Sequence, residues 1–275
     1  MDKILFGTAG IPISTIPRNT AEGIKQVRKL GLDAMELEFV QSVNISEEKT
    51  PLIKQAAKEN NVALTCHGQY YINLNSVEKE KREASIERIL KAAKITWMCG
   101  GWSVCFHAAY YLGNPVLAYK NVKESLKEVV KKLRDDGIDV WIRPETGGKT
   151  NQFGSLEELI KISQDVEGVL PCIDFAHHYS RSLGKVNTYE DFYFILESLE
   201  KELGRQALDN MHCHTEGIHF GDTGERYHMN LEDSKINFQD LVKTWKEFKI
   251  KGVIICESPN IEKDALLLKN LYSKS

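Results

Sequence analysis

VLPCIDFAHHYS, residues 169–180, combines a buried strand with the side chains of a functional site. The first part of the stretch, as far as Ile173, is mostly apolar, which is typical of a strand that is covered on both faces. The strand then ends in the carboxylate of Asp174, which is followed by the adjacent imidazoles of His177 and His178. We expect this arrangement where the ends of buried strands surround a shared site.

The same order of a short apolar run and a helix-like stretch is repeated along the whole chain. The predicted strands are residues 3–7, 33–39, 62–68, 102–108, 139–145, 169–175, 210–214 and 252–258. Apolar residues at three- and four-residue spacing predict helices at residues 19–30, 48–59, 77–98, 115–133, 155–166, 188–203, 237–248 and 260–272.

Eight strands that alternate with eight helices indicate parallel pairing through helical crossovers. The 275 residues therefore predict an α/β fold, an eight-stranded parallel (β/α)8 TIM barrel, as a single domain over residues 1–275. A doubly wound open sheet is the alternative, but no glycine-rich dinucleotide fingerprint follows the first strand. The longest connection without a predicted helix, residues 215–236, is long enough to indicate a functional loop.

Composition limits the class of protein. Hydrophobic residues make up 42% of the chain and charged residues 27%, as in a globular enzyme. No apolar run is long enough for a bilayer, and the N-terminal residues lack the regions of a signal peptide, so we expect a cytoplasmic protein without a membrane partner. The net charge of −3 gives no general electrostatic argument for nucleic acid. The cysteines form no CxxC pair, so we expect buried reduced thiols, and we expect the neighbouring His and Glu rather than these thiols as metal ligands.

Six consecutive predicted strands end in His, Asp or Glu. These residues are His67, His107, Glu145, Asp174 with His177 just beyond it, His212 and His214, and Glu257. In a parallel α/β barrel the C-terminal ends of the strands surround one site. His212 and His214 alternate along their strand, so we expect His214 near the mouth and His212 deeper, in a structural role. His178 is expected to face away from His177 and to be exposed to solvent.

Imidazoles and three carboxylates in one cavity indicate bound cations. Any one of these residues alone would more often be structural, so the argument depends on their joint pattern. Carboxylates alone would raise one another's pKa values, whereas metal ions hold them deprotonated. Nitrogen and carboxylate ligands favour zinc, manganese or iron over calcium. The ligands exceed the needs of one tetrahedral ion, so we expect at least two ions, and three as the fuller set.

Five stretches of the chain resemble the endonuclease IV family of apurinic/apyrimidinic endonucleases, within the xylose-isomerase-like barrel superfamily. They are HGQYYINL at 67–74, FHAAYYLG at 106–113, RPETGGKTNQFGSLEEL at 143–159, CIDFAHHYSRSLG at 172–184 and ICESPN at 255–260. The resemblance implies a zinc-dependent hydrolase of DNA repair that cleaves the phosphodiester 5′ to abasic sites. It implies two or three Zn2+ ions, with Mn2+ as the alternative. The expected partner is double-stranded DNA containing abasic sites, and we expect a monomer.

The resemblance also implies the roles of the candidate residues. Glu145 would be the catalytic residue and would bridge two ions. The implied ligand sets are His67, His107 and Glu145 for the first ion, Glu145, Asp174, His214 and Glu257 for the second, and His177 and His228 for the third. Tyr70 stands where the family has an aromatic residue that contacts DNA.

Two stretches depart from the pattern of the family. Residues 221–230 contain His228, but Arg226 stands where the family has an aspartate, so Glu225 or Asp222 would have to complete the third ligand set. The segment FVQSVN after the second strand lacks the arginine expected to intrude on DNA. The candidate contacts for the DNA backbone are Lys149, Arg181, Arg205 and Arg226.

A divalent-metal-dependent sugar isomerase or epimerase is the alternative function. Xylose-isomerase-like barrels have a Glu, Asp, His, Glu quartet that resembles Glu145, Asp174, His214 and Glu257. Such an enzyme uses one ion and leaves no role for His67, His107, His177 and His228. A metal-binding protein without catalytic activity is a third hypothesis, should the third ligand set be incomplete.

Overall fold

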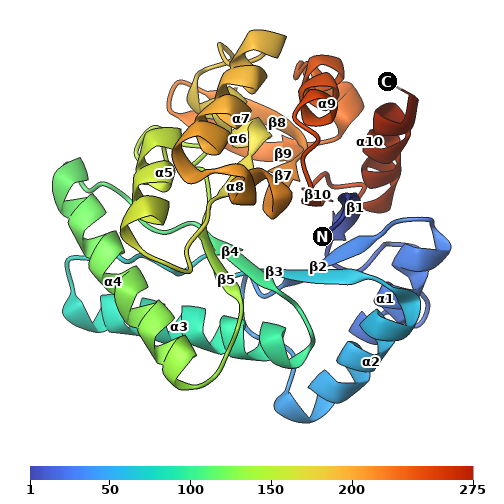
Figure 1. Ribbon diagram of the computed structural model, residues 1–275, viewed down its shortest axis with the longest axis horizontal. Helices are drawn as coiled ribbons and strands as arrows, with labels where there is room; N and C mark the ends of the chain where they lie inside the picture. The colour runs from blue at the N-terminus through green and yellow to red at the C-terminus, as the bar shows by residue number, and fades with distance from the viewer. Residues whose placement is uncertain (275) are drawn as a thin grey trace.

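The computed structural model describes residues 1–274, and its centre is a sheet of eight parallel strands (Figure 1). The strands follow the spatial order β5-β4-β3-β2-β1-β10-β7-β6. Their bounds are β1 (Ile4–Ala9), β2 (Ala34–Glu38), β3 (Ala63–His67), β4 (Ser103–Phe106), β5 (Trp141–Pro144), β6 (Cys172–Asp174), β7 (Met211–Thr215) and β10 (Gly252–Cys256). Each lies within one residue or two of a predicted strand, and β6 is shorter than predicted.

The sheet curls into a nearly closed barrel. The two end strands, β5 and β6, meet through parallel bridges that join Ile142 to Val169 and Glu145 to Cys172. The Thr146 amide also donates to the Cys172 carbonyl oxygen at 3.1 Å. An open doubly wound sheet would leave these strands as separate edges, so the TIM-barrel prediction is confirmed.

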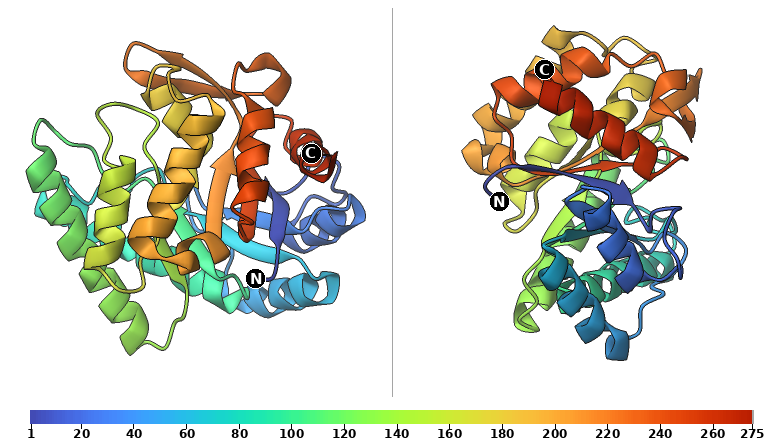
Figure 2. Two further views of the ribbon diagram at one scale, coloured as in Figure 1. Left: turned by 45° about the horizontal axis from the view of Figure 1, so that its top comes forward. Right: turned by 90° about the vertical axis from the view of Figure 1, so that its right-hand side faces the viewer.

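Helices surround the strands on the outside of the barrel, as both views in Figure 2 show. The helices are α1 (Thr20–Lys29), α2 (Thr50–Asn60), α3 (Lys79–Met98), α4 (Pro115–Asp135), α5 (Leu156–Asp165), α6 (Phe175–Arg181), α7 (Tyr189–Leu203), α8 (Arg205–Asp209), α9 (Phe238–Glu247) and α10 (Glu262–Lys274). The sequence predicts all of them except the short α6 and α8.

Local sequence signals explain where several helices begin. Ser155 and Glu158 form a capping box at the start of α5, and Thr188 and Asp191 form one at the start of α7. In each box the two side chains satisfy backbone N–H groups that the first helical turn leaves without a partner. These boxes fix the helix starts and therefore the lengths of the preceding loops.

Two apolar clusters support the barrel. The large one lies between strands and helices and includes Phe106, Phe175 and Trp245, all fully buried. The small one contains the strand residues Ala34, Val253 and Ile255. Most of the burial that stabilises the fold is therefore outside the strands, between them and the helices.

The segment between β7 and α9 contains an antiparallel hairpin that the sequence analysis does not predict. Its strands are β8 (Gly217–Gly221) and β9 (Gly224–Met229), and the 3-10 turn η2 (Leu231–Asp233) follows. The loop after β5 holds this hairpin, because the Glu225 amide donates to the Gly148 carbonyl and the Thr150 amide to the Thr223 carbonyl, both at 3.0 Å. The predicted functional loop is thus an ordered element attached to the barrel.

The two ends of the chain lie together. Strand β1 pairs with β10, and Lys269 of α10 binds Asp33 at the start of β2. Arg28 of α1 binds the other oxygen of Asp33 at 2.9 Å. Among residues 1–274, no helix is long and apolar enough to cross a membrane.

Candidate metal centre

Strand ends and the hairpin bring the predicted ligands together at one mouth of the barrel. Among the groups of donor atoms that lie within 4.8 Å of one another, three correspond to the three expected ligand sets. The first group is His67, His107 and Glu145, the second is Glu145, Asp174, His214 and Glu257, and the third is His177, Glu225 and His228. The first two groups have the members that the resemblance implies, and the third adds Glu225, one of the two acids expected there.

Glu145 is the residue that joins the groups. Its Oε2 lies 3.2 Å from His67 Nε2 and 3.7 Å from His107 Nδ1. Its Oε1 lies 3.0 Å from His214 Nδ1 and 3.5 Å from His177 Nδ1. Each oxygen of this fully buried carboxylate thus faces a different group. One carboxylate in this position can bridge two ions.

Backbone carbonyls determine which ring nitrogen faces the centre. His67 Nδ1 lies 2.8 Å from the carbonyl oxygen of Gly68, and His177 Nδ1 lies 2.9 Å from that of Thr146. These contacts place the N–H on Nδ1 and leave Nε2 free as a ligand. The rings are therefore oriented as metal-binding imidazoles are.

Several buried polar atoms at the mouth have no hydrogen-bond partner among residues 1–274. They include Glu145 Oε2, Asp174 Oδ2, His107 Nδ1 and His177 Nε2. Buried polar atoms are normally hydrogen-bonded, and an exception requires an explanation. Each of these atoms belongs to a residue of a ligand group, so nitrogen- and oxygen-binding ions of the zinc type fit the centre.

The pKa values of two carboxylates in the barrel shift in opposite directions. Burial raises the pKa of Glu145, but His107, His214 and His67 hold it well below its usual range. Burial and the nearby charge of Glu36 raise the pKa of Glu38 to about 8. Such crowding of carboxylates is relieved by cations.

The hairpin supplies two of the three members of the third group. Glu225 Oε2 lies 3.6 Å from His177 Nε2, and Glu225 Oε1 lies 3.7 Å from His228 Nε2. Gly148 leaves room for this group, because a Cβ at that position would lie 2.7 Å from Glu225 Oε2 and 2.7 Å from His177 Cδ2. Asp222 is exposed at the turn of the hairpin, so Glu225 is the acid that the fold brings to His228.

A cavity of about 420 Å³ opens over the three groups. It is lined by ligands from all three, and Tyr70, Tyr110 and Lys149 also contribute to its wall. The side chain of Tyr70 is 64% exposed, and its ring centroid lies 6.0 Å from that of His67. An aromatic side chain therefore stands at the rim, in reach of any molecule that enters.

A family model for the xylose isomerase-like TIM barrel matches residues 24–271. The chain belongs to the xylose isomerase-like TIM barrel family. An uncharacterised protein of Methanocaldococcus jannaschii is 42% identical over 272 residues, which cover 98% of this chain and 97% of that protein. Apurinic-apyrimidinic endonuclease 1 of Plasmodium falciparum is 25% identical over 217 residues, which cover 75% of this chain and 36% of that protein. The chain thus spans about a third of the length of the Plasmodium protein.

Solved structures share the fold of this family member. A D-tagatose 3-epimerase-like protein has a TM-score of 0.76 at 20% identity, with 98% of this chain and 96% of that chain covered. Endonuclease IV from Thermus thermophilus has a TM-score of 0.75 at 18% identity, with 98% of both chains covered. The barrel is enzyme-like: it has distant sequence similarity to a Plasmodium apurinic-apyrimidinic endonuclease and to a probable endonuclease 4 of Aquifex aeolicus (25% identical, 58% of each chain), and it shares its fold with an epimerase-like protein.

Sequence reasoning missed three carboxylates of this barrel, of which two are buried and Glu38 is half-buried. Glu36 and Glu38 alternate along β2, and Glu216 follows His214 by two residues. Glu36 and Glu216 are fully buried, and Glu216 lies with Asp174 and His177. A two-residue spacing places side chains on the same face of a strand, as it does for His212 and His214. The same spacing relates Glu36 to Glu38 and His214 to Glu216, so it could have indicated these acids.

Three expectations about single residues need correction. His178 is half-buried instead of exposed, and its Nε2 is enclosed. Arg181 donates to the carbonyl oxygens of Gly147, Lys149 and Gln152, so it supports a loop and is not free to contact DNA. Arg205 begins α8 and binds Asp209 and Glu200 next to the start of β7, at the opposite end of the barrel.

Proposed function

We propose that this protein is a zinc-dependent phosphodiesterase that cleaves DNA on the 5′ side of abasic sites. The observation that carries the proposal is the third ligand group, in which the hairpin adds Glu225 and His228 to His177. Three ligand groups that share one cavity suit a phosphate, which several ions can bind together. A sugar epimerase with one ion would need only one of these groups. The distant similarity to an apurinic-apyrimidinic endonuclease supports the same chemistry.

The ligand groups imply how the reaction is divided among the residues. Bound divalent ions supply water activation near neutral pH and counter-charge for the phosphate and the leaving oxygen. Glu145, with one oxygen toward each of two groups, orients the attacking water or accepts its proton. Glu225 and His228 hold the far side of the cavity, where the phosphate must be placed for attack.

The shape of the mouth agrees with an extruded nucleotide as substrate. The ligand groups lie at the base of the cavity, and a duplex is too wide to enter it. The abasic sugar therefore has to leave the helix, which costs least where a base is missing. Tyr70 at the rim is placed to cover the gap that the extruded sugar leaves.

A sugar epimerase remains the second candidate, for one specific reason. The group of Glu145, Asp174, His214 and Glu257 alone forms a four-ligand site for one ion. A D-tagatose 3-epimerase-like protein shares this fold, which supports the second candidate. The epimerase hypothesis gives no role to Glu225 and His228 of the hairpin.

The proposal is tested with a duplex oligonucleotide that contains one tetrahydrofuran abasic analogue. The zinc-loaded protein is expected to nick the strand on the 5′ side of the analogue and to leave a 3′-hydroxyl, while an undamaged duplex stays intact. A ketohexose is incubated with the same preparation in parallel. Epimerised sugar together with an uncut abasic duplex would overturn the proposal in favour of the second candidate.

A further inference from the structure

The barrel strands carry a second set of polar side chains beneath the metal centre. Side chains alternate along a strand, so the residue two positions before each mouth residue also points into the barrel. Four of these pairs of inner and mouth residues are Glu36 and Glu38, Cys105 and His107, Cys172 and Asp174, and His212 and His214. All four inner residues are fully buried. We call Glu36, Cys105, Cys172 and His212 the inner layer.

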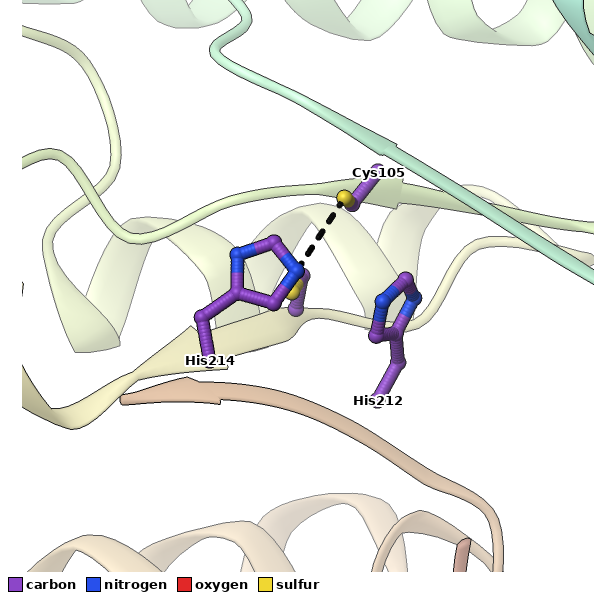
Figure 3. Close-up of side chains that lie close together, drawn as sticks. Cys105, His212 and His214 are labelled. Carbon is purple, nitrogen blue, oxygen red and sulfur yellow. Dashed lines mark hydrogen bonds between the residues drawn. The ribbon is translucent and has the colours of Figure 1, made fainter. Parts of the chain in front are cut away.

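A polar inner layer is unusual, because branched apolar side chains normally fill the interior of such barrels. One donor atom each of Cys105, Cys172, His212 and His214 lies within 4.8 Å of the other three. Figure 3 shows the Cys105 thiol and the two imidazoles turned toward one another, with Cys105 Sγ 3.6 Å from His214 Nε2. Two sulfurs and two imidazole nitrogens are the donor set of a closed zinc site.

Neighbouring contacts leave one nitrogen of each ring for the inner layer. Ser103 Oγ lies 2.9 Å from His212 Nδ1, so Nε2 is the inner donor of that ring. His214 turns Nδ1 to Glu145 at 3.0 Å and Nε2 to the inner layer. Both rings therefore have a nitrogen available where the two thiols meet.

The carboxylate of Glu36 contacts both nitrogens, but without a well-formed hydrogen bond to His212. Its oxygens lie 2.7 Å from His212 Nε2 and 2.8 Å from His214 Nε2. In the part of the chain that the structure describes, however, neither His212 Nε2 nor Glu36 Oε1 has a partner with hydrogen-bond geometry. A fully buried nitrogen without a hydrogen bond is costly, and coordination to a cation would satisfy it.

Charge also favours a cation at this place. Metal-binding cysteines are thiolates, and Cys105 Sγ lies 3.8 Å from Glu36 Oε2. Without an ion, the Cys105 thiol is protonated and donates to this carboxylate; zinc binding would displace the thiol proton and bring counter-charge for the thiolate. Arg143, the register partner of Cys105 on β5, contributes one buried positive charge. A divalent ion between the thiolates supplies the remaining counter-charge.

We propose that Cys105, Cys172, His212 and Nε2 of His214 bind a structural zinc ion inside the barrel, below the metal centre of the mouth. All four ligands come from the protein and are fully buried, so the ion has no open position for a substrate. His214 lies between both sites: as a neutral imidazole it would give Nε2 to the inner ion and donate its Nδ1–H to Glu145, and it would bind an ion at each nitrogen only after losing that proton. The inner ion therefore also fixes the ring that serves the mouth.

The sulfur ligands give a test that does not depend on catalysis. X-ray absorption at the zinc edge of the fully zinc-loaded protein is expected to show a zinc–sulfur shell at about 2.3 Å. The three mouth groups contain no sulfur donor, so this shell reports the inner ion alone. The cobalt-loaded protein is likewise expected to show sulfur-to-cobalt charge-transfer absorption in the near ultraviolet.

Variants identify the ligands. Cys105→Ser combined with Cys172→Ser is expected to lose the sulfur shell and about one equivalent of zinc by elemental analysis. Cys213→Ser is the matched control, because Cys213 is equally buried on β7 but points away from the barrel interior, and it is expected to keep both signals.

Two results would overturn the inner site: no sulfur signal in the fully loaded native protein, or a sulfur signal that persists in the double variant. The spectra of the native protein decide the matter alone if the double variant does not fold. A sulfur shell in a protein that leaves abasic DNA uncut would support the inner ion and count against the proposed nuclease only.

Discussion

Glu145→Gln tests the role of the residue that joins the ligand groups. The carboxylate turns Oε2 to His67 and Oε1 to His214, so each oxygen serves a different group. An amide retains only one oxygen, and its NH2 group then faces the other set of ligands. At most one of the first two ions keeps its Glu145 ligand, and the metal content is expected to fall by at least one equivalent.

The same substitution sets the expected loss of activity. An ion that polarises the reacting groups contributes several kcal/mol, so losing about 3–4 kcal/mol lowers the cleavage rate roughly 100- to 1000-fold. Folding is expected to change little, because glutamine has nearly the same shape and the helices and strands around the mouth do not depend on its charge.

The assay is single-turnover cleavage of the abasic duplex, with zinc content measured on the same samples. Circular dichroism and thermal unfolding report the fold. Glu157→Gln is the matched control, because Glu157 is an exposed acid in the first turn of α5 and takes no part in the mouth. A Glu145→Gln protein that retained its full zinc content and cut at close to the native rate would refute the bridging role.

Three further predictions concern other parts of the molecule. His228→Ala is expected to remove about one zinc equivalent, to leave the fold intact and to weaken cleavage, since the hairpin then offers only Glu225 to the third group; unchanged zinc content and activity would make His228 a loop residue without a ligand role. Gly148→Ala is expected to lose the same ion selectively under mild chelation, because the added Cβ displaces Glu225; an ion that resists chelation as in the native protein would contradict this. Lys269 and Arg28 lower the pKa of Asp33 from its usual 3.8 although burial raises it, so the stabilisation is present above about pH 4 and is lost as the pH falls through the lowered pKa. Asp33→Asn is therefore expected to lower the free energy of unfolding by about 1 kcal/mol at pH 7 and by much less near pH 3, measured by urea unfolding at both values, and an equal loss at both would show that charge is not the cause.

The fold was predictable because each strand and helix has its own local periodicity. The apolar strands are short and separated by amphipathic helices, so their order alone defines parallel pairing. The hairpin was missed for the opposite reason. Ile218 is the one buried large apolar side chain of the two strands and Phe220 is half-buried, so the apolar pattern of residues 217–229 is too short to indicate a strand pair. The turn residues DTG at 222–224 were the remaining local signal.

The positions of residues at the strand ends show which side chains gather at the mouth. They do not show which partners those side chains contact. The contact of Glu36 with His212 and His214 joins β2 to β7, and nothing near any of these residues in sequence indicates it. Likewise, the positive charge of Arg181 is typical of a DNA contact. Only its hydrogen bonds to three carbonyl oxygens show that the guanidinium already has partners within the protein. Sequence shows which face a side chain takes on a strand, whereas its hydrogen-bond partners depend on the closed barrel.

The separate attachment of the hairpin has a consequence for how such barrels diversify. The ligands of the first two groups stand on different strands, so no single exchange of sequence could add or remove them together. Glu225 and His228 stand on one contiguous segment between β7 and α9. Replacement of that segment in one recombination event would delete most of a metal site and leave the barrel intact. If the proposed function holds, the third ligand group can be inherited as a single exchangeable loop, and the hairpin is then the unit to transplant when a new activity is designed.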